Sequence, residues 1–287
     1  MSLLIIGLGG QSVFLTVPHF HRPEETLHAT SIFAEPGGKG YNQAVAAARM
    51  GASVTFSQAI GRDSDGEACT RRLVAEGITP RMRVKDGQTA YAVILTSDAG
   101  ENRVTVYPGV TLSAQDVYAI EDAFETARMV LLTPEIPEDA FAAAMALAKK
   151  HGVCAVVNPA PYTPWVKKYL GDAWLITPNR AEACALLECD EGEIEAAVAK
   201  APYARMVVTL GGDGALVKDG DTLTRIPARR VTPVDTTGAG DCLNGVLCAM
   251  MLSGMPLAEA AQKAVHAASI SVTRAHVLDA MPRRDEV

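Results

Sequence analysis

Short apolar runs alternate with amphipathic helical segments over the middle of this chain, and that alternation limits its possible folds more than any other feature. The apolar runs predict strands at residues 129–132, 154–157, 173–177 and 206–210. The segments between them predict helices near residues 138–151, 180–187 and 191–200. Apolar strands separated by helices are typical of a mostly parallel sheet that is covered on both faces. We therefore expect an α/β fold, a three-layer sandwich around a mostly parallel central sheet.

The composition fits one such domain over residues 1–287 and narrows the range of partners. Apolar residues make up 48% of the chain and the formal net charge is −7, which argues against a nucleic-acid-binding surface. Residues 1–7 lack the basic start of a signal peptide, and no apolar run approaches the roughly 20 residues that cross a bilayer. The six cysteines form no CxxC pair. We expect reduced thiols in a cytoplasmic protein without membrane contact.

Two segments outside this alternation have the character of strands. Residues 11–35 and 89–107 contain β-branched and aromatic residues, and a turn at 98–100 separates two alternating runs, which predicts a hairpin. We expect these segments to form a small sheet set apart from the main fold, as a lid or as a dimer surface. A homodimer through this sheet is expected because its apolar surface would otherwise be exposed.

The stretch from residue 234 to 241 reads Val-Asp-Thr-Thr-Gly-Ala-Gly-Asp and lies directly before a predicted helix. Gly238 and Gly240 flank Ala239 and allow a sharp turn, which points the free N–H groups of the first helical turn at one place. That place favours an anion, and Asp241 beside it is suited to be the base in a phosphoryl transfer. Alternatively, Asp241 only caps the helix.

A second glycine-rich stretch, Gly37-Gly38-Lys39-Gly40-Tyr41-Asn42, begins another predicted helix near residues 41–50. Together with residues 235–241 it closely resembles the two signature motifs of the ribokinase-like (PfkB) family of sugar and nucleoside kinases. The resemblance spans nearly the whole chain and is nearest to the ribokinases. It implies a three-layer fold with a β-sheet lid, and ATP and Mg²⁺ as cofactors. It also implies phosphorylation of a primary hydroxyl on a small-molecule sugar or nucleoside.

The resemblance implies roles for the residues of both motifs. Asp241 would deprotonate the acceptor hydroxyl, while the amides of Gly238, Ala239 and Gly240, called the anion hole below, would hold the moving phosphoryl group. The residues that would bind the acceptor are Gly37, Gly38, Lys39, Asn42 and Glu135. Lys39 could also be a solvated side chain, although a lysine between two glycines before a helix more often serves an anion or a hydroxyl.

Three further sites resemble the nucleotide and metal motifs of the family. Asn179 and Glu182 match its NxxE motif, in which Glu182 would organise hydrated Mg²⁺, but the same spacing fits a helix capping box equally well. The nucleotide loop would contain Thr209, Gly211 and Gly214, although a glycine turn there also fits a hairpin. His266 falls near the adenine pocket of the family, whereas a lone histidine on an alanine-rich helix more often only packs.

The chain departs from the ribokinases in two places. Gly10 and Ser12 stand where ribokinases have an Asn and an Asp that hold the sugar hydroxyls, so we expect a different acceptor, recognised by Gln11 and Ser12. Asp235 matches a residue that contacts a monovalent cation in some relatives, but residues 275–280 do not match the second part of that site. Activation by K⁺ is therefore left open.

Three other functions compete with a sugar kinase. A nucleoside kinase of the adenosine or pseudouridine type fits the same motifs, and no sequence feature separates the two cleanly. A non-catalytic sugar-binding regulator on a kinase scaffold would explain the altered acceptor motif, but it would not need Asp241, Asn179 and Glu182. A Rossmann dehydrogenase is disfavoured because residues 7–12 lack the third glycine of GxGxxG and no helix is predicted after them.

Overall fold

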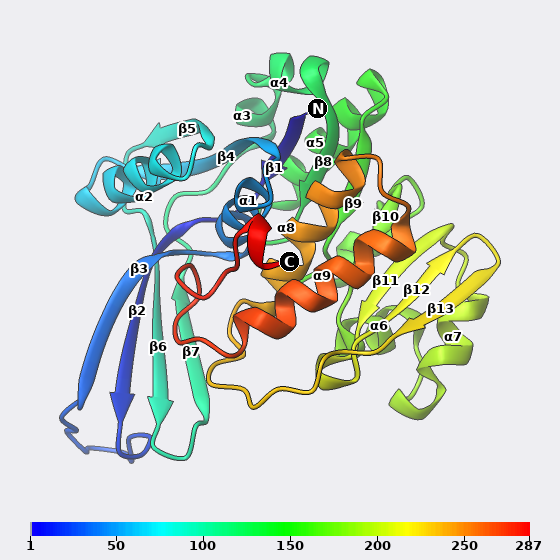
Figure 1. Cartoon of the computed structure of the whole chain (residues 1–287). Coiled ribbons are helices and arrows are strands. Elements are labelled where there is room, and N and C mark those ends of the chain that lie inside the picture. Colours follow the sequence, from blue (N-terminus) through cyan, green and yellow to red (C-terminus); the bar gives the residue numbers. More distant parts are fainter. Residues whose placement is uncertain (1) are drawn as a thin grey trace.

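The computed structural model describes residues 2–287, and its largest element is a nine-stranded sheet of order β13-β12-β11-β10-β9-β8-β1-β4-β5 (Figure 1). The strands are β1 (Ser2–Ile6), β4 (Ser53–Gly61), β5 (Thr79–Lys85), β8 (Ala127–Leu132), β9 (Cys154–Val157), β10 (Leu175–Ile176), β11 (Arg205–Thr209), β12 (Ala215–Asp219) and β13 (Thr222–Ile226). Neighbouring strands from β5 to β11 are all parallel, whereas β12 runs antiparallel to both of its neighbours, β11 and β13. The expected mostly parallel sheet is confirmed.

Helices cover both faces of this sheet, because successive side chains of each strand point into two separate apolar layers. Leu3 and Ile5 of β1 belong to one core, and Leu4 and Ile6 belong to the other. The helices of the first core are α1 (Lys39–Arg49), α2 (Ser64–Ala75), α8 (Ala239–Leu252) and α9 (Leu257–Ser271). Those of the second are α3 (Ala114–Tyr118), α4 (Glu121–Thr126), α5 (Glu138–His151), α6 (Arg180–Leu187) and α7 (Ile194–Lys200). The three-layer α/β sandwich is confirmed, and among residues 2–287 no helix has the length and apolar character needed to cross a membrane.

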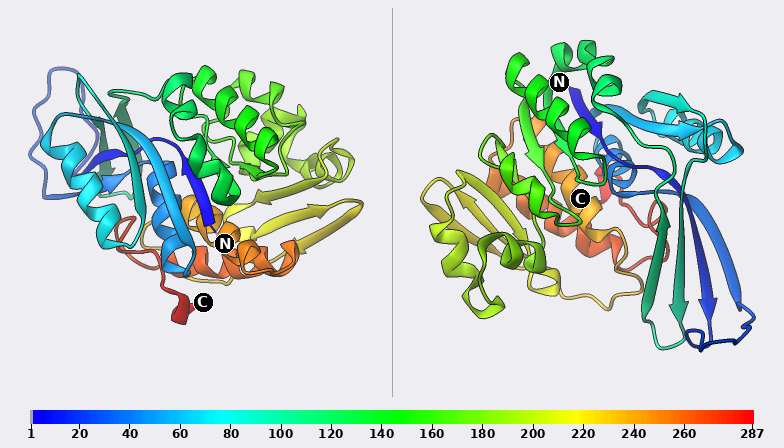
Figure 2. Two further views of the ribbon diagram at one scale, coloured as in Figure 1. Left: turned by 90° about the horizontal axis from the view of Figure 1, so that it is seen from above. Right: turned by 180° about the vertical axis from the view of Figure 1, so that it is seen from behind.

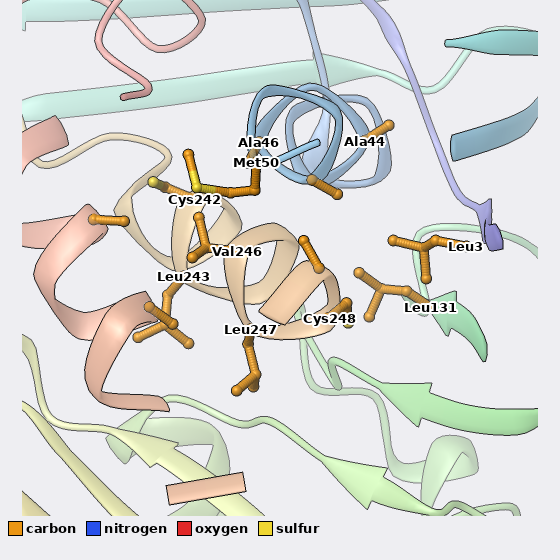
Figure 3. Close-up of a cluster of buried hydrophobic side chains, with 14 of the residues drawn as sticks. Leu3, Ala44, Ala46, Met50, Leu131, Cys242, Leu243, Val246, Leu247 and Cys248 are labelled. Atoms are coloured by element: carbon orange, nitrogen blue, oxygen red, sulfur yellow. The ribbon is translucent and has the colours of Figure 1, made fainter. Parts of the chain in front are cut away.

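Helix α8 lies in the middle of the first core and packs against α1 on one side and α9 on the other (Figure 3). Its approach to α1 depends on Gly245, where an added Cβ would lie 2.4 Å from the Gln43 carbonyl oxygen and 2.7 Å from Cβ of Ala46. Such close packing needs a glycine on one helix and a small residue on the other. As a result, the first turns of the two helices that follow the glycine motifs lie at the same end of the fold.

A second sheet of four strands projects from the body of the fold (Figure 1 and Figure 2). Its strands, in the order β3-β2-β6-β7, are β3 (Ser31–Gly37), β2 (Gly10–Val17), β6 (Ala90–Ser97) and β7 (Asn102–Tyr107). The hairpin expected around residues 98–100 is the antiparallel β6–β7 pair. Since β3 ends at Gly37 and α1 begins at Lys39, the small sheet is rooted directly in the first glycine motif.

Two strands of the large sheet differ from the sequence expectation. β5, with the sequence TPRMRVK, is an edge strand that carries three basic residues, so it lacks the apolar run by which the other strands are found. The strand expected at residues 173–177 is only the two-residue β10. Its flanking residues Trp174 and Thr177 still donate to the carbonyls of Ala155 and Val157, so the contact with β9 extends beyond the regular ladder.

We expect Gly245→Ala to destabilise the fold, because the new methyl group would press on the backbone of Gln43. Overpacking of a core typically costs about 1–3 kcal/mol, and each kcal/mol lowers the Tm of a chain near this size by roughly 2–4 °C. Gly171→Ala is the matched control, since an added Cβ there meets nothing within 4 Å. Calorimetric melting of both variants measures the difference, and equal Tm values would contradict the close approach of α1 and α8.

Candidate active site

A cleft of about 530 Å³ lies beyond the carboxyl ends of β9, β10 and β11, where ligands of parallel sheets usually bind. Its wall on the side of the sheet contains Asn158, Thr177, Asn179, Glu182, Thr209 and Gly211. Its wall on the side of the helices contains Lys39, Gly238, Gly240, Asp241 and Asn244. The structure therefore brings both glycine motifs and three of the residues that follow strands, Asn158, Asn179 and Gly211, to one cleft.

The first turn of α8 forms part of the cleft wall with its backbone. Gly238 is the N-cap residue in the left-handed region, with φ of 73°, and it has no side chain to cap the first-turn amides of the helix. At Gly240 an added Cβ would meet nothing within 4 Å, so the backbone there is accessible to a ligand. The Ala239 N–H donates to the Thr236 carbonyl over 3.3 Å, and the remaining amides of the first turn, together with the partial positive charge of the helix start, favour an anion at this point.

The carboxylate of Asp241 is buried beside these amides, with 7% of the residue exposed. Its Oδ2 accepts a hydrogen bond of 2.9 Å from Nδ2 of Asn42, and its Oδ1 accepts one of 3.2 Å from Nε2 of Gln43. Burial raises the pKa of Asp241, while nearby Lys39 and the two amide donors lower it. The carboxylate is held in one orientation and faces the cleft, as a base must be.

A chain of amide side chains ties Asp241 to the sheet. Nε2 of Gln43 also donates to Oδ1 of Asn158 over 3.0 Å, and Nδ2 of Asn158 donates to the Thr177 carbonyl over 2.7 Å. The Thr177 hydroxyl donates to Asn244 of α8, whose Nδ2 donates to the Gly240 carbonyl over 2.9 Å. Sequence reasoning missed Gln43 and Asn244. The sequence feature that could have identified them is an amide side chain on an otherwise apolar, buried face of a helix.

Lys39 lies among three carboxylates of the site. The pKa of Lys39 is raised, chiefly by Asp241 and then by Glu135 and Glu182, against the effect of burial. The backbone N–H of Lys39 donates to Oε2 of Glu135 over 3.2 Å. Burial raises the pKa of Glu135 to about 8, with Lys39 lowering it and Asp241 raising it further. The charges of Lys39 and Asp241 thus stabilise each other, while Glu135 tends to hold a proton near neutral pH.

The start of the small sheet contains residues that the sequence predicts to bind the acceptor. An added Cβ at Gly37 would lie 2.6 Å from Oγ of Ser12, and one at Gly10 would lie 2.1 Å from the Ala90 carbonyl oxygen. The backbone of β6 therefore leaves no space for a side chain at position 10. Gln11 lies on the opposite face of β2 from Ser12, because successive residues of a strand alternate. Within residues 2–287, the buried Oδ1 of Asn42 has no hydrogen-bond partner.

Asn179 and Glu182 form a capping box at the start of α6 and also line the cleft. Oδ1 of Asn179 accepts from the Glu182 N–H over 2.9 Å, and Oε2 of Glu182 accepts from the Asn179 N–H over 2.8 Å. Burial raises the pKa of Glu182. Each side chain uses one polar atom in the cap, which leaves the amide N–H₂ of Asn179 and Oε1 of Glu182 for a ligand.

A second cavity of about 590 Å³ adjoins the cleft and shares Thr209, Gly211 and Gly240 with it. Its wall is mostly apolar and includes Leu243, Val265, Ala268 and Val272. Gly214 also lines it, with φ of 94° and an added Cβ that would lie 1.9 Å from the Ile226 carbonyl oxygen. A polar cleft beside an apolar cavity suits a ligand with an anionic end and a flat apolar end.

Two of the expected ligand-binding residues line neither cavity. His266 lines an adjoining hollow that shares Arg229 and Val265 with the second cavity, and burial lowers the pKa of His266. Asp235 lies in the loop before α8, where its Oδ1 accepts the Thr237 N–H over 2.9 Å. That hydrogen bond shapes the turn that leads to Gly238.

Comparison with known proteins agrees with this geometry. The family model described as pfkB family carbohydrate kinase matches residues 5–284. A ribokinase of Bacillus subtilis is 35% identical over 289 residues, which cover 98% of this chain and 96% of the relative. A ribokinase structure from Thermotoga maritima superposes with a TM-score of 0.89 at 28% identity, covering 99% of this chain and 97% of that chain. One from Cryptococcus neoformans, in complex with ADP, gives a TM-score of 0.83 at 27% identity over 99% of this chain and 97% of that chain.

Glu135→Gln should flatten the dependence of stability on pH. The pKa of Glu135 in the folded protein, about 8, lies above its ordinary value of 4.5, so the folded state holds the proton between these values. The free energy of unfolding therefore falls as pH rises through this window, by about 1.4 kcal/mol per pH unit from this carboxyl. Urea unfolding at about pH 5.5 and about pH 7.5 measures the fall. The wild type should lose more stability than Glu135→Gln, the exposed control Glu193→Gln should follow the wild type, and equal losses in all three would show that the pKa is not raised.

Proposed function

Because this chain belongs to the pfkB family of carbohydrate kinases and is therefore a phosphotransferase, we propose that it transfers the terminal phosphoryl group of ATP to a primary hydroxyl of a sugar. One observation carries the proposal: the buried carboxylate of Asp241 lies at the first turn of α8, next to the accessible backbone of Gly240. A general base and an anion hole are thus adjacent, which phosphoryl transfer to a hydroxyl requires.

In the proposed reaction, positioning and electrostatics supply most of the catalysis. The acceptor hydroxyl lies against Asp241, which takes the proton as the oxygen attacks the terminal phosphorus in line. The bond between that phosphorus and the bridging oxygen breaks, and ADP leaves. The amides of Gly238, Ala239 and Gly240 donate to the phosphoryl oxygens. Lys39, on the opposite motif, offsets the negative charge of the carboxylate and the phosphates. Burial raises the pKa of Asp241 and so makes it a stronger base than an exposed aspartate.

ATP is proposed as the donor because the two adjoining cavities separate a polar cleft for phosphates from an apolar pocket for a base. The Cryptococcus relative was solved with ADP. ATP is abundant in the cytoplasm, where we place the reaction, and the six free cysteines would stay reduced there. Thr209, Gly211 and Gly214 would form the nucleotide loop, with Asn179 beside the phosphates.

Mg²⁺ is proposed at Glu182, through water. Among residues 2–287, no group of three His, Cys, Asp or Glu side chains could hold a metal, so an ion here would be bound mainly by phosphate oxygens and water, which suits Mg²⁺. The free Oε1 of Glu182 fits this role. The ion supplies charge neutralisation on the phosphates when bound. Asp235 is the one residue proposed to contact K⁺.

The acceptor is proposed to be a sugar that differs from ribose in its hydroxyl pattern. The Bacillus relative is named a ribokinase, but Ser12 cannot replace a carboxylate that binds two hydroxyls, and position 10 has no space for a side chain. A screen of pentoses, hexoses, their phosphates and nucleosides, read by ADP release, identifies the acceptor. If only nucleosides are phosphorylated, the proposed acceptor is a nucleoside and not a sugar.

Asp241→Asn should abolish phosphoryl transfer and preserve nucleotide binding. The amide has nearly the shape of the carboxylate but cannot take a proton, and loss of a general base lowers kcat by roughly 10²–10⁴-fold. Steady-state turnover with the best acceptor of the screen, together with ADP binding by calorimetry, measures both effects. Asp221→Asn, which changes an exposed residue in the turn between β12 and β13, is the control. Wild-type turnover in Asp241→Asn would show that another group is the base.

A homodimer through the small sheet is proposed from the character of one of its faces. Strand registers place Ile32, Leu15, Leu95 and Arg103 side by side, and the same face carries Val13, Val93, Tyr91 and Tyr107. Ile32 is 72% exposed, and Tyr91 and Tyr107 are also exposed. An apolar face of this extent on an open sheet is typical of a surface that is covered in solution. The opposite face carries the buried residues Ser12 and Glu35.

Ile32→Lys should convert the dimer to a monomer, since it places a charge in the centre of the proposed contact. Val104→Lys is the matched control: Val104 is 58% exposed on the same sheet, but registers place it on the opposite face. Light scattering after size-exclusion chromatography gives the mass of each protein. A monomeric wild type, or a dimeric Ile32→Lys variant, would contradict this interface.

A further inference from the structure

The loop of residues 275–281 lies between the small sheet and the start of α8, and a buried carboxylate of the small sheet holds it. Oε1 of Glu35 accepts hydrogen bonds from the Val277 N–H over 2.8 Å and the Leu278 N–H over 3.3 Å, and its Oε2 accepts the Leu278 N–H over 3.2 Å. Glu35 is 5% exposed and lies on β3, two residues before Gly37 of the acceptor motif. The sequence motifs predict no role for Glu35.

A second residue of β3 fixes the same loop. The ring of His276 stacks on Phe33 with a centroid distance of 3.5 Å and an interplanar angle of 20°. His276 is in the left-handed region, with φ of 69°, which is unfavourable for a residue other than glycine. Phe33 and Glu35 share one face of β3, so together they hold the loop in a conformation that it would not adopt alone.

The loop in turn contacts the anion hole. Cγ1 of Val277 lies 2.3 Å from the place where a Cβ on Gly238 would be, so the valine side chain packs directly on the glycine that begins α8. Val277 is buried. Arg49 of α1 also fixes the loop: it donates to the carbonyl of Leu278 over 2.5 Å and to that of Met281 over 2.9 Å, and it forms a buried ion pair with Glu76. The N–H groups of Val277 and Leu278 and the ring of His276, in contrast, are held by β3.

We infer that Glu35 is a positioning residue for phosphoryl transfer: it holds Val277 against Gly238 and so fixes the direction of the anion-hole amides. This inference rests on the proposed function. Through one strand it links the acceptor motif at Gly37 to the anion hole at Gly238, so the acceptor side and the phosphoryl side of the site keep a constant separation. Small displacements of reacting groups lower rates strongly, which gives such a link a measurable effect.

Three variants and their combination test the link. Glu35→Ala removes the acceptor of both N–H groups, while Glu35→Gln keeps an oxygen for the shorter bond from Val277. Val277→Ala removes the contact with Gly238 but keeps the N–H that bonds to Glu35. Glu101→Ala, which removes an exposed carboxylate of the same small sheet, is the control. The readouts are kcat and KM with ATP and the best acceptor of the screen, and ADP binding by calorimetry.

We expect Glu35→Ala and Val277→Ala each to lower kcat by roughly tenfold with KM for ATP changed less than about twofold. Glu35→Gln should retain most of the rate, and the double variant should be no slower than Val277→Ala alone, because both changes break one link. ADP should bind all variants with wild-type stoichiometry, which separates this role from a general loss of folded protein.

The inference alone would be overturned by a Glu35→Ala variant with wild-type kcat, or by losses in the double variant that multiply as independent effects do. A loss of kcat that only follows a loss of ADP-binding stoichiometry would also overturn it, because Glu35 would then be needed merely for folding. A wild type that binds ADP but phosphorylates no acceptor would instead overturn the proposed function, and the inference with it.

Discussion

The geometry of the candidate active site depends on one contact between α1 and α8. In this contact the side-chain amides of Asn42 and Gln43 on α1 donate hydrogen bonds to the buried carboxylate of Asp241 on α8. A carboxylate buried without partners would take up a proton or destabilise the fold. The two donors and the charge of Lys39 offset part of that penalty, and the pKa of Asp241 is still raised. Because the donors belong to a different helix, α1 and α8 must pack closely, which Gly245 allows.

This contact joins two motifs that lie about two hundred residues apart in the chain, since 199 positions separate Asn42 from Asp241. The parallel sheet supplies the facing wall of the cleft, because β9, β10 and β11 end at the same edge. The network through Asn158, Thr177 and Asn244 then connects Asp241 to the sheet and to the Gly240 carbonyl in the first turn of α8. Asp241 and the first turn of α8 are thus parts of one hydrogen-bonded arrangement with the sheet.

Sequence reasoning reached the sheet and both glycine motifs because these follow from local patterns: apolar runs between helices, and glycines before a helix. It could not separate a ligand role of Asn179 and Glu182 from a capping box, and the structure has a capping box within the cleft, so the two are compatible. Gln43 and Glu35 were missed for a different reason. Their partners, Asp241 and the loop at Val277, are distant in sequence, and only tertiary packing brings them together.

The central claim is that Asp241 and the amides of the anion hole act on the same phosphoryl group. A crystal structure of the protein with ADP, aluminium fluoride and the acceptor tests it most directly. The account predicts the fluoride within about 3.2 Å of the amides at Gly238, Ala239 and Gly240, and the acceptor hydroxyl within hydrogen-bond distance of the Asp241 carboxylate. An acceptor hydroxyl bound away from Asp241, or a fluoride held only by side chains elsewhere in the cleft, would contradict it.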